Sequence, residues 1–125
     1  MVIVHHTDAD GWLGAAVCAK AASPDAGEIK FIPFNYGDLD INNVERGEKV
    51  VCVDTSLNNN EKSLKQWEEL FDKSMNVTFI DHHESTMDVL KEQPDFFSRH
   101  NTEYFCDKTR SGCYLAYIYF SAIKI

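Results

Sequence analysis

Short apolar runs alternate along this chain with longer segments whose apolar residues recur at helical spacing. The apolar runs, which predict strands, cover residues 2–4, 29–34, 50–53 and 77–80, and a fifth strand is predicted over Thr102–Cys106. Helices are predicted over residues 11–22, 60–72, 85–91 and 111–123. Because strands that alternate with helices usually form βαβ units, the pattern predicts an α/β fold around a parallel sheet.

Individual residues refine this pattern. Pro33 lacks a backbone N–H, so the strand that contains it is expected at an edge of the sheet. Leu64, Trp67 and Phe71 lie on one face of the helix predicted over residues 60–72, which makes it an amphipathic helix that covers the sheet. The polar stretch of residues 35–49 predicts a loop with one short helix at most.

The last segment is apolar or aromatic around its whole circumference from Cys113 to Phe120. In a helix, this pattern predicts burial on more than one side. Two explanations remain open. Either a second copy of the chain covers the helix, giving a homodimer through the C-terminal helix, or the chain is the front part of a longer protein.

Length and charge bound the kind of protein. With 125 residues, 44% of them hydrophobic, the chain is long enough for one core, and we expect one domain. It has 12 Lys and Arg against 20 Asp and Glu, a formal charge of −8. This balance argues against binding long duplex DNA, whose affinity comes from neutralised phosphates. A short oligonucleotide or a small phosphorylated substrate held by metal ions fits better.

The four cysteines form no CxxC pair, and the start of the chain lacks the basic and apolar regions of a leader peptide. No segment has the roughly 18 consecutive apolar residues of a membrane span. We therefore expect a reduced, cytoplasmic protein with no membrane partner.

Ionisable residues follow three of the predicted strands directly. His6, Asp8 and Asp10 follow the first, Asp54 follows the third, and Asp81, His82 and His83 follow the fourth. A carboxylate at the end of an apolar strand is costly unless another charge, such as a bound cation, compensates it. The carboxyl ends of parallel strands meet at one edge of a sheet, where ligands bind. These residues are therefore expected to converge.

The residue types predict a centre for two divalent ions. If the segment after the first strand is extended, its alternate residues His6, Asp8 and Asp10 face the same way as metal ligands. Asp54 would bridge two ions and His82 would complete the set. Oxygen and imidazole ligands without thiolate favour Mn²⁺, with Mg²⁺, Co²⁺ or Zn²⁺ as substitutes. Two ions about 3.5–4 Å apart are typical of metal-assisted phosphoester hydrolysis.

Two further residues have predicted catalytic roles. His83 would donate to the phosphate or the leaving group, and Asp81 would orient a histidine through its ring N–H. Each residue also has an ordinary explanation when taken alone. A histidine pair at a strand end is commonly a cap or a loop residue, Asp54 could start a helix, and His5 could simply be the last residue of its strand. Convergence from three strand ends favours a functional site.

These residues resemble the motifs of the DHH phosphoesterase superfamily. The segment His6-Thr7-Asp8-Ala9-Asp10-Gly11 resembles the first motif of that family. Asp54, after an apolar strand, resembles the second motif, and Asp81-His82-His83 resembles the third. Residues 107–112, followed by an aromatic helix, also resemble a segment of some bacterial and phage members. The resemblance implies a five-stranded parallel sheet flanked by helices on both faces and a two-Mn²⁺ centre, with the five ligands named above and His83 meeting substrate.

The resemblance also implies what surrounds this domain. Residues 1–125 correspond to the N-terminal part of a DHH domain. The fourth motif, with a further metal-binding aspartate, and a smaller C-terminal substrate-binding domain are expected after it and are not in this sequence. Members include RecJ-type exonucleases, nanoRNases, cyclic-dinucleotide phosphodiesterases and manganese-dependent pyrophosphatases. Three hypotheses follow: a phosphodiesterase acting on short oligonucleotides or cyclic dinucleotides, a pyrophosphatase-like hydrolase, and an inactive truncated domain that acts by association.

Overall fold

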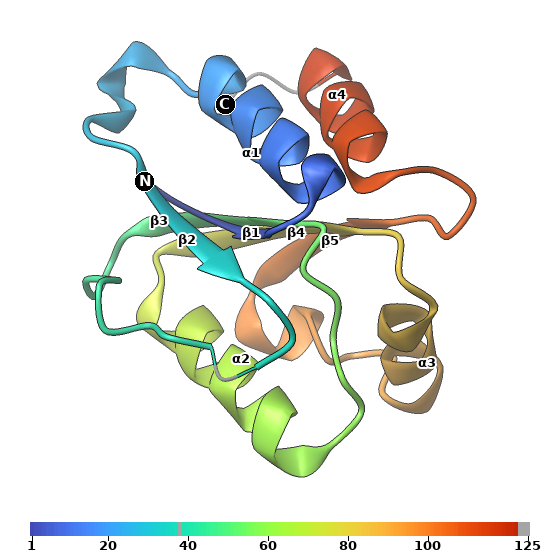
Figure 1. Cartoon of the computed structure of the whole chain (residues 1–125). Coiled ribbons are helices and arrows are strands. Elements are labelled where there is room, and N and C mark those ends of the chain that lie inside the picture. Colours follow the sequence, from blue (N-terminus) through green and yellow to red (C-terminus); the bar gives the residue numbers. More distant parts are fainter. Residues whose placement is uncertain (38, 123–125) are drawn as a thin grey trace.

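The computed structural model describes residues 1–37 and 39–122, which form a three-layer α/β fold (Figure 1). The five strands are β1 (Val2–His6), β2 (Lys30–Phe34), β3 (Lys49–Val53), β4 (Asn76–Asp81) and β5 (Thr102–Cys106). All neighbouring strands pair in parallel, in the order β2-β1-β3-β4-β5. The predicted α/β class and five-stranded parallel sheet are therefore confirmed.

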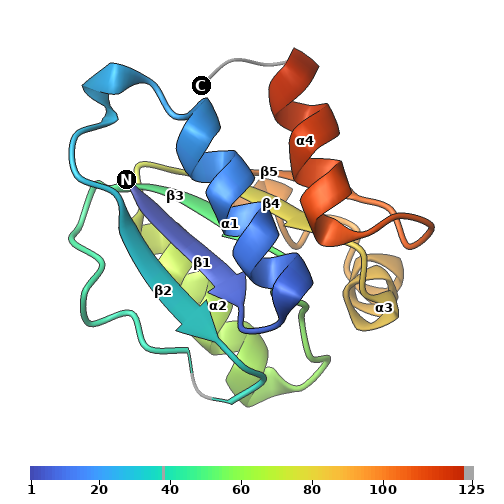
Figure 2. The ribbon, with the colours of Figure 1, turned by 45° about the horizontal axis from the view of Figure 1, so that its top comes forward.

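Helices cover both faces of the sheet. Figures 1 and 2 show α1 (Ala9–Ala21) and α4 (Gly112–Ala122) side by side on one face, with α2 (Glu61–Lys73) on the other. The remaining helices are α3 (Glu84–Glu92) and the short 3₁₀ helices η1 (Pro24–Ala26) and η2 (Ser98–His100). None of the helices in the described ranges has the length and apolar character that a bilayer crossing requires.

The alternation of side chains along each strand divides the core into two layers. In β1, Val2 and Val4 belong to the cluster that contains Trp67 of α2, whereas Ile3 belongs to the cluster that contains Leu115 of α4. This is the two-residue period of a strand covered on both faces. Full burial of an aromatic such as Trp67 contributes about 1.5–3 kcal/mol, so the amphipathic face of α2 anchors that layer.

The strand order reverses between β1 and β3. The chain runs from β1 through α1 to β2 on one side, and then returns to place β3 on the other side of β1. Loops after two neighbouring strands leave in opposite directions at such a point, which opens a crevice beyond their carboxyl ends. His6 ends β1 and Asp54 directly follows β3, so the topology brings both to this crevice.

Most predicted elements form where expected, with two differences. α1 begins at Ala9, two residues before its predicted start, because the Asp8 side chain accepts a hydrogen bond from Gly11 N and caps the helix. Residues 35–37 and 39–48 contain no helix, which agrees with the predicted loop. In α4, which packs on α1 and on the sheet, Leu115 and Phe120 are buried, but Tyr117 is 60% exposed, so within the described chain one side of this helix stays uncovered.

Candidate metal centre

Two groups of histidine and aspartate side chains lie at the carboxyl edge of the sheet. One consists of Asp54, Asp81, His82 and His83, and the other of His6, Asp8 and Asp54. Within each group, the possible ligand atoms lie within 4.8 Å of one another. Both groups contain Asp54, so the structure brings residues from the ends of β1, β3 and β4 around one shared carboxylate.

The His82 and His83 rings are held by different carboxylates. His82 Nε2 lies 2.7 Å from Asp54 Oδ1, and His83 Nδ1 lies 2.7 Å from Asp81 Oδ1. The other Asp81 oxygen accepts a hydrogen bond of 2.5 Å from Thr86 Oγ1 in α3. Asp81 is fully buried and anchored at both oxygens, so it fixes the orientation of His83. This is the contact expected for Asp81, and its role in catalysis stays a prediction.

His6 presents one ring nitrogen to the centre. Its Nε2 lies 3.1 Å from Asn35 Oδ1, and in the neutral tautomer that donates this hydrogen bond the lone pair of the ring is on Nδ1. Nδ1 lies 3.0 Å from Asp8 Oδ2 and 3.9 Å from Asp54 Oδ2. These atoms are close without forming a hydrogen bond, since buried His6 Nδ1 and Asp54 Oδ2 have no hydrogen-bond partner.

Asp54 is the least satisfied carboxylate of the centre. Only 1% of the residue is exposed, and burial, together with the negative charges of Asp10 and Asp8, raises its pKa to about 8. Its backbone is also unusual, because its φ of 61° lies in the left-handed region that non-glycine residues rarely adopt. Buried, close to other carboxylates and strained, Asp54 has the environment expected of a functional group rather than of a structural one.

The donor set fits divalent cations. A lone pair on His6 Nδ1 and an unpartnered oxygen of Asp54 face each other in a buried place that already holds several carboxylates. Unpartnered buried polar atoms cost free energy, and a bound cation would satisfy them both. The oxygen and imidazole donors suit a metal such as Mn²⁺ or Mg²⁺, although the identity of the ion does not follow from them alone.

Asp10 lies beside these groups but outside both. Its carboxylate accepts hydrogen bonds from Gly112 N (2.9 Å) and Cys113 N (2.8 Å) at the start of α4, and Oδ2 lies 3.3 Å from His82 Nε2. Burial acts to raise the pKa of Asp10, but these amides outweigh it and the pKa is lowered. The expected extended segment is therefore wrong, because Asp8 caps α1 and places Asp10 in its first turn.

Three neighbours of the centre were not predicted as site residues. The Tyr36 hydroxyl lies 3.2 Å from His83 Nε2, and the Tyr36 ring packs on His6 with 4.5 Å between ring centroids. Asn35 orients His6, and Thr86 anchors Asp81. Asn35 and Tyr36 follow β2 directly, so their position after a strand was a signal equal to that of Asp54. They were missed because an amide and a phenol are not typical metal ligands.

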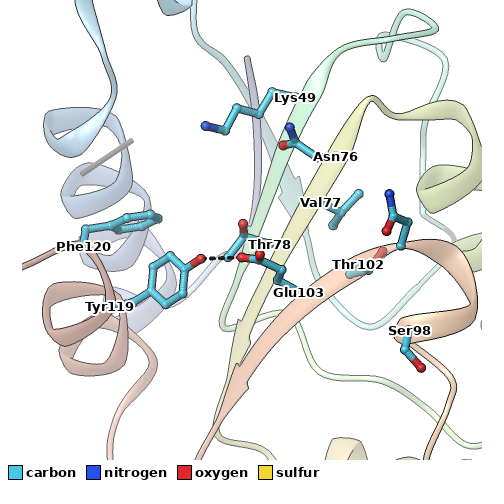
Figure 3. A pocket seen from close by; sticks show the side chains of 10 residues that line it. Lys49, Asn76, Val77, Thr78, Ser98, Thr102, Glu103, Tyr119 and Phe120 are labelled. Carbon is cyan, nitrogen blue, oxygen red and sulfur yellow. Dashed lines mark hydrogen bonds between the residues drawn. The ribbon is translucent and has the colours of Figure 1, made fainter. Parts of the chain in front are cut away.

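A hollow at the opposite, amino edge of the sheet lies away from the centre. It measures about 470 Å³ and lies between the starts of β3, β4 and β5 and the end of α4 (Figure 3). There Tyr119 Oη donates a 2.9 Å hydrogen bond to Glu103 Oε2. This hollow contains none of the predicted site residues.

The chain belongs to the DHH family. The family model described as "DHH family, N-terminal domain" matches residues 1–124, which confirms the predicted resemblance over nearly the whole sequence. With the histidine and aspartate groups described above, the family match supports a metal-dependent phosphoesterase-type centre. No curated protein matches the chain significantly.

One solved structure shares the fold. It is the crystal structure of an uncharacterized protein from Helicobacter pylori G27, with a TM-score of 0.67 and 21% sequence identity. The match covers 99% of this chain and 36% of that protein's chain, so this chain spans about a third of its length. At this identity the likeness shows the fold alone.

Proposed function

We propose that this protein is a metal-dependent phosphoesterase that hydrolyses phosphodiester bonds of short oligonucleotides or cyclic dinucleotides. The observation that carries the proposal is Asp54, a buried carboxylate shared by two groups of possible ligands at the point where the strand order reverses. A carboxylate shared by two ligand groups could bridge a pair of divalent ions such as those of two-metal hydrolases.

The residues divide into two tasks. His6, Asp8, Asp10, Asp54 and His82 are the proposed metal ligands, with Asp10 the one whose oxygens now bind the amides of α4. Bound ions would neutralise the carboxylates, polarise a phosphoryl oxygen and lower the pKa of a water nucleophile. The hydrogen bond that His83 Nδ1 donates to the Asp81 carboxylate raises the pKa of His83. The raised pKa favours the imidazolium form of His83, which is proposed to donate a proton or a hydrogen bond to the substrate phosphate or its leaving group.

Charge supports a small substrate. The formal net charge of −8 repels long polyanions, whereas ions at the centre would attract a single phosphodiester locally. Short oligonucleotides and cyclic dinucleotides present few phosphates beyond the one that reacts, so they fit this balance.

The test is hydrolysis with Mn²⁺. Di- to pentanucleotides and a cyclic dinucleotide are incubated with the protein, and products are separated by chromatography. We expect Mn²⁺-dependent release of mononucleotides that a chelator abolishes. The Asp54→Ala variant is the control. If the unsubstituted protein produces no more hydrolysis than this variant, the proposed function is wrong.

A pyrophosphatase-like activity is the alternative within the same chemistry, because the same ligand groups would serve a phosphoanhydride. Release of orthophosphate from pyrophosphate, at a kcat/KM above that for dinucleotides, would favour it. The comparison needs one enzyme preparation with both substrates, so that metal loading is the same in both assays.

Association of an inactive domain is supported by a separate feature. Leu13 of α1 and Tyr117 of α4 are 58% and 60% exposed and line one apolar hollow. A second copy of the chain on this face would form the homodimer predicted for the C-terminal helix. Sedimentation of the protein and of the Tyr117→Glu variant tests it. A monomer at all concentrations in both would remove this alternative.

A further inference from the structure

Tyr36 has a backbone conformation that its side chain does not favour. Its φ is 56°, in the left-handed region where aromatic residues are rare. A glycine at position 36 would adopt this conformation without strain. A bulky residue kept in such a conformation commonly has a function at that place.

Tyr36 contacts the metal centre and also lines a neighbouring hollow. Its ring packs against His6 and its hydroxyl reaches His83. The same residue lines a hollow of about 340 Å³. Tyr36 is 47% exposed, so part of the residue is accessible to a bound group. The hollow and the metal centre therefore share one wall.

The remaining lining of this hollow is polar and comes from Gly37 in the loop after β2, from the loop after β3 and from the first turns of α2. It consists of Gly37, Asn58, Asn60, Lys62, Ser63 and Gln66. Amide groups both donate and accept hydrogen bonds, as the edges of nucleobases do. Within the part of the chain that the structure describes, no hydrogen bond uses the Asn58 side chain. The volume is at the lower end of the about 300–1,000 Å³ typical of ligand pockets.

We propose that this hollow binds the nucleoside next to the phosphate that reacts, with Tyr36 as the stacking wall and Asn58 and Lys62 as polar contacts. The inference rests on the proposed function, because it places the reacting phosphate at the metal centre. The lining suits a flat group with several hydrogen-bonding atoms, tethered to an anion. An aliphatic or lipid group would find few apolar contacts here, in contrast to the apolar hollow between α1 and α4.

The experiment compares three ligands by calorimetry in the presence of Mn²⁺: adenosine 5′-monophosphate, ribose 5-phosphate and inorganic phosphate. We expect adenosine 5′-monophosphate to bind about tenfold or more tightly than the other two, because stacking and base contacts add to the phosphate contact. Equal affinity for adenosine 5′-monophosphate and ribose 5-phosphate would overturn the proposal, since only the sugar would then be recognised.

Three variants locate the binding. Tyr36→Gly removes the ring but keeps the left-handed backbone, and it should reduce the ratio of nucleotide to phosphate affinity about tenfold. Asn58→Ala and Lys62→Ala should reduce the ratio about fivefold each. Lys65→Ala is the matched control, because Lys65 is an exposed lysine of the same helix that pairs with Glu61 and does not line the hollow. If Lys65→Ala reduced the ratio of nucleotide to phosphate affinity as much as Lys62→Ala, the proposal would be contradicted.

A second substrate separates this inference from the proposed function. Bis(4-nitrophenyl) phosphate is a phosphodiester without a nucleoside, so its hydrolysis reports on the metal centre alone. The protein could hydrolyse this compound and yet bind adenosine 5′-monophosphate no more tightly than ribose 5-phosphate. That result would overturn the assignment of the hollow as a nucleoside site, but it would leave the phosphoesterase proposal standing. Nucleotide preference that the Tyr36→Gly variant loses would support the hollow even if no hydrolysis occurred.

Discussion

The two edges of the sheet differ in whether their polar groups have hydrogen-bond or ion-pair partners. At the amino edge, Lys30 Nζ pairs with Glu48 and donates a 2.8 Å hydrogen bond to Asn43 O. At the carboxyl edge, buried atoms of His6, Asp54 and Thr55 have no hydrogen-bond partner. The same parallel strands supply both edges, so the difference comes from the residues placed there and from the crevice that the reversal of strand order opens at the carboxyl ends.

Among the described non-glycine residues, left-handed backbone conformations occur at both edges, with more of them at the carboxyl edge. Asp54 and Ser56, after β3, and Tyr36, after β2, have φ values between 56° and 61°, and at the amino edge Asn101, before β5, has a φ of 56°. A protein has no stability reason to combine unpartnered polar atoms with strained residues in one place. The unpartnered atoms named above lie at the carboxyl edge, where the proposed cation would satisfy them. Variants at each edge should therefore separate stability from activity.

The largest effect is expected from Asp54→Asn. Loss of the shared carboxylate should lower kcat/KM for a dinucleotide with Mn²⁺ by about 100-fold or more, because even partners that only support a ligand cost 10- to 100-fold. The metal-free variant should also resist urea better than the unsubstituted protein at pH 9, since it no longer buries a charge. Asp88→Asn, an exposed residue of α3, is the control. Full activity in Asp54→Asn would contradict the proposal that the carboxyl edge carries the activity.

The second effect is a pH dependence of metal binding. The pKa of Asp54 is raised to about 8 by burial and by neighbouring carboxylates, so below pH 8 an ion must displace its proton. Mn²⁺ affinity should therefore fall by up to about tenfold per pH unit below 8. Calorimetry in buffers of different ionisation enthalpy should show about one proton released at pH 7. An affinity that is constant from pH 6 to pH 8 would contradict this assignment.

The same pKa has a consequence for the metal-free protein. An unfolded aspartate titrates near 3.9, so below about pH 4 Asp54 is protonated in both states and carries no penalty. As the pH rises through about 8, the folded carboxyl must become a buried anion, and its contribution to stability is lost. Urea titrations without metal should show this loss between pH 4 and pH 9, and Asp54→Asn should show less of it.

The third effect is expected from Gly112→Ala at the start of α4. An added Cβ would lie 2.8 Å from Asp54 Cβ, closer than such contacts occur, so either Asp54 or the start of the helix must shift. We expect about 1–3 kcal/mol of lost stability, as for other overpacked sites, and about tenfold lower kcat/KM, because a small displacement of catalytic groups is costly. Unchanged kcat/KM with reduced stability would show that the position of Asp54 is less critical than proposed.

The features of the fold and site that could be predicted from the sequence are those set by local patterns and by the topology that these patterns imply. The strands and helices follow from local periodicity, and Pro33 marked β2 as an edge strand, which the strand order confirms. Convergence of Asp54, Asp81 and His82 followed from the rule that parallel strands end at one edge. These inferences needed only the sequence pattern and the topology that it implies.

The details that failed depend on contacts between distant segments. Asp10 accepts hydrogen bonds from amides about a hundred residues later, and no spacing near Asp10 indicates this. The contact of Tyr36 with His83 joins the loop after β2 to the end of β4. The start of α1 was a local failure, because the capping of Gly11 N by Asp8 outweighed the alternation of polar residues from which an extended segment was expected.

The smallest effect is expected from Tyr119→Phe, at the other end of the helix that begins with Gly112. The change removes the hydrogen bond to Glu103 in the hollow at the amino edge (Figure 3). A partly exposed hydrogen bond of this kind is worth about 1 kcal/mol or less, so urea titration should show a small loss and kcat/KM should not change. Because Gly112 and Tyr119 belong to one helix, their comparison controls for general loosening of α4. If Tyr119→Phe lowered kcat/KM as much as Gly112→Ala, activity would depend on the stability of the whole helix, and the distinction between the two edges would fail.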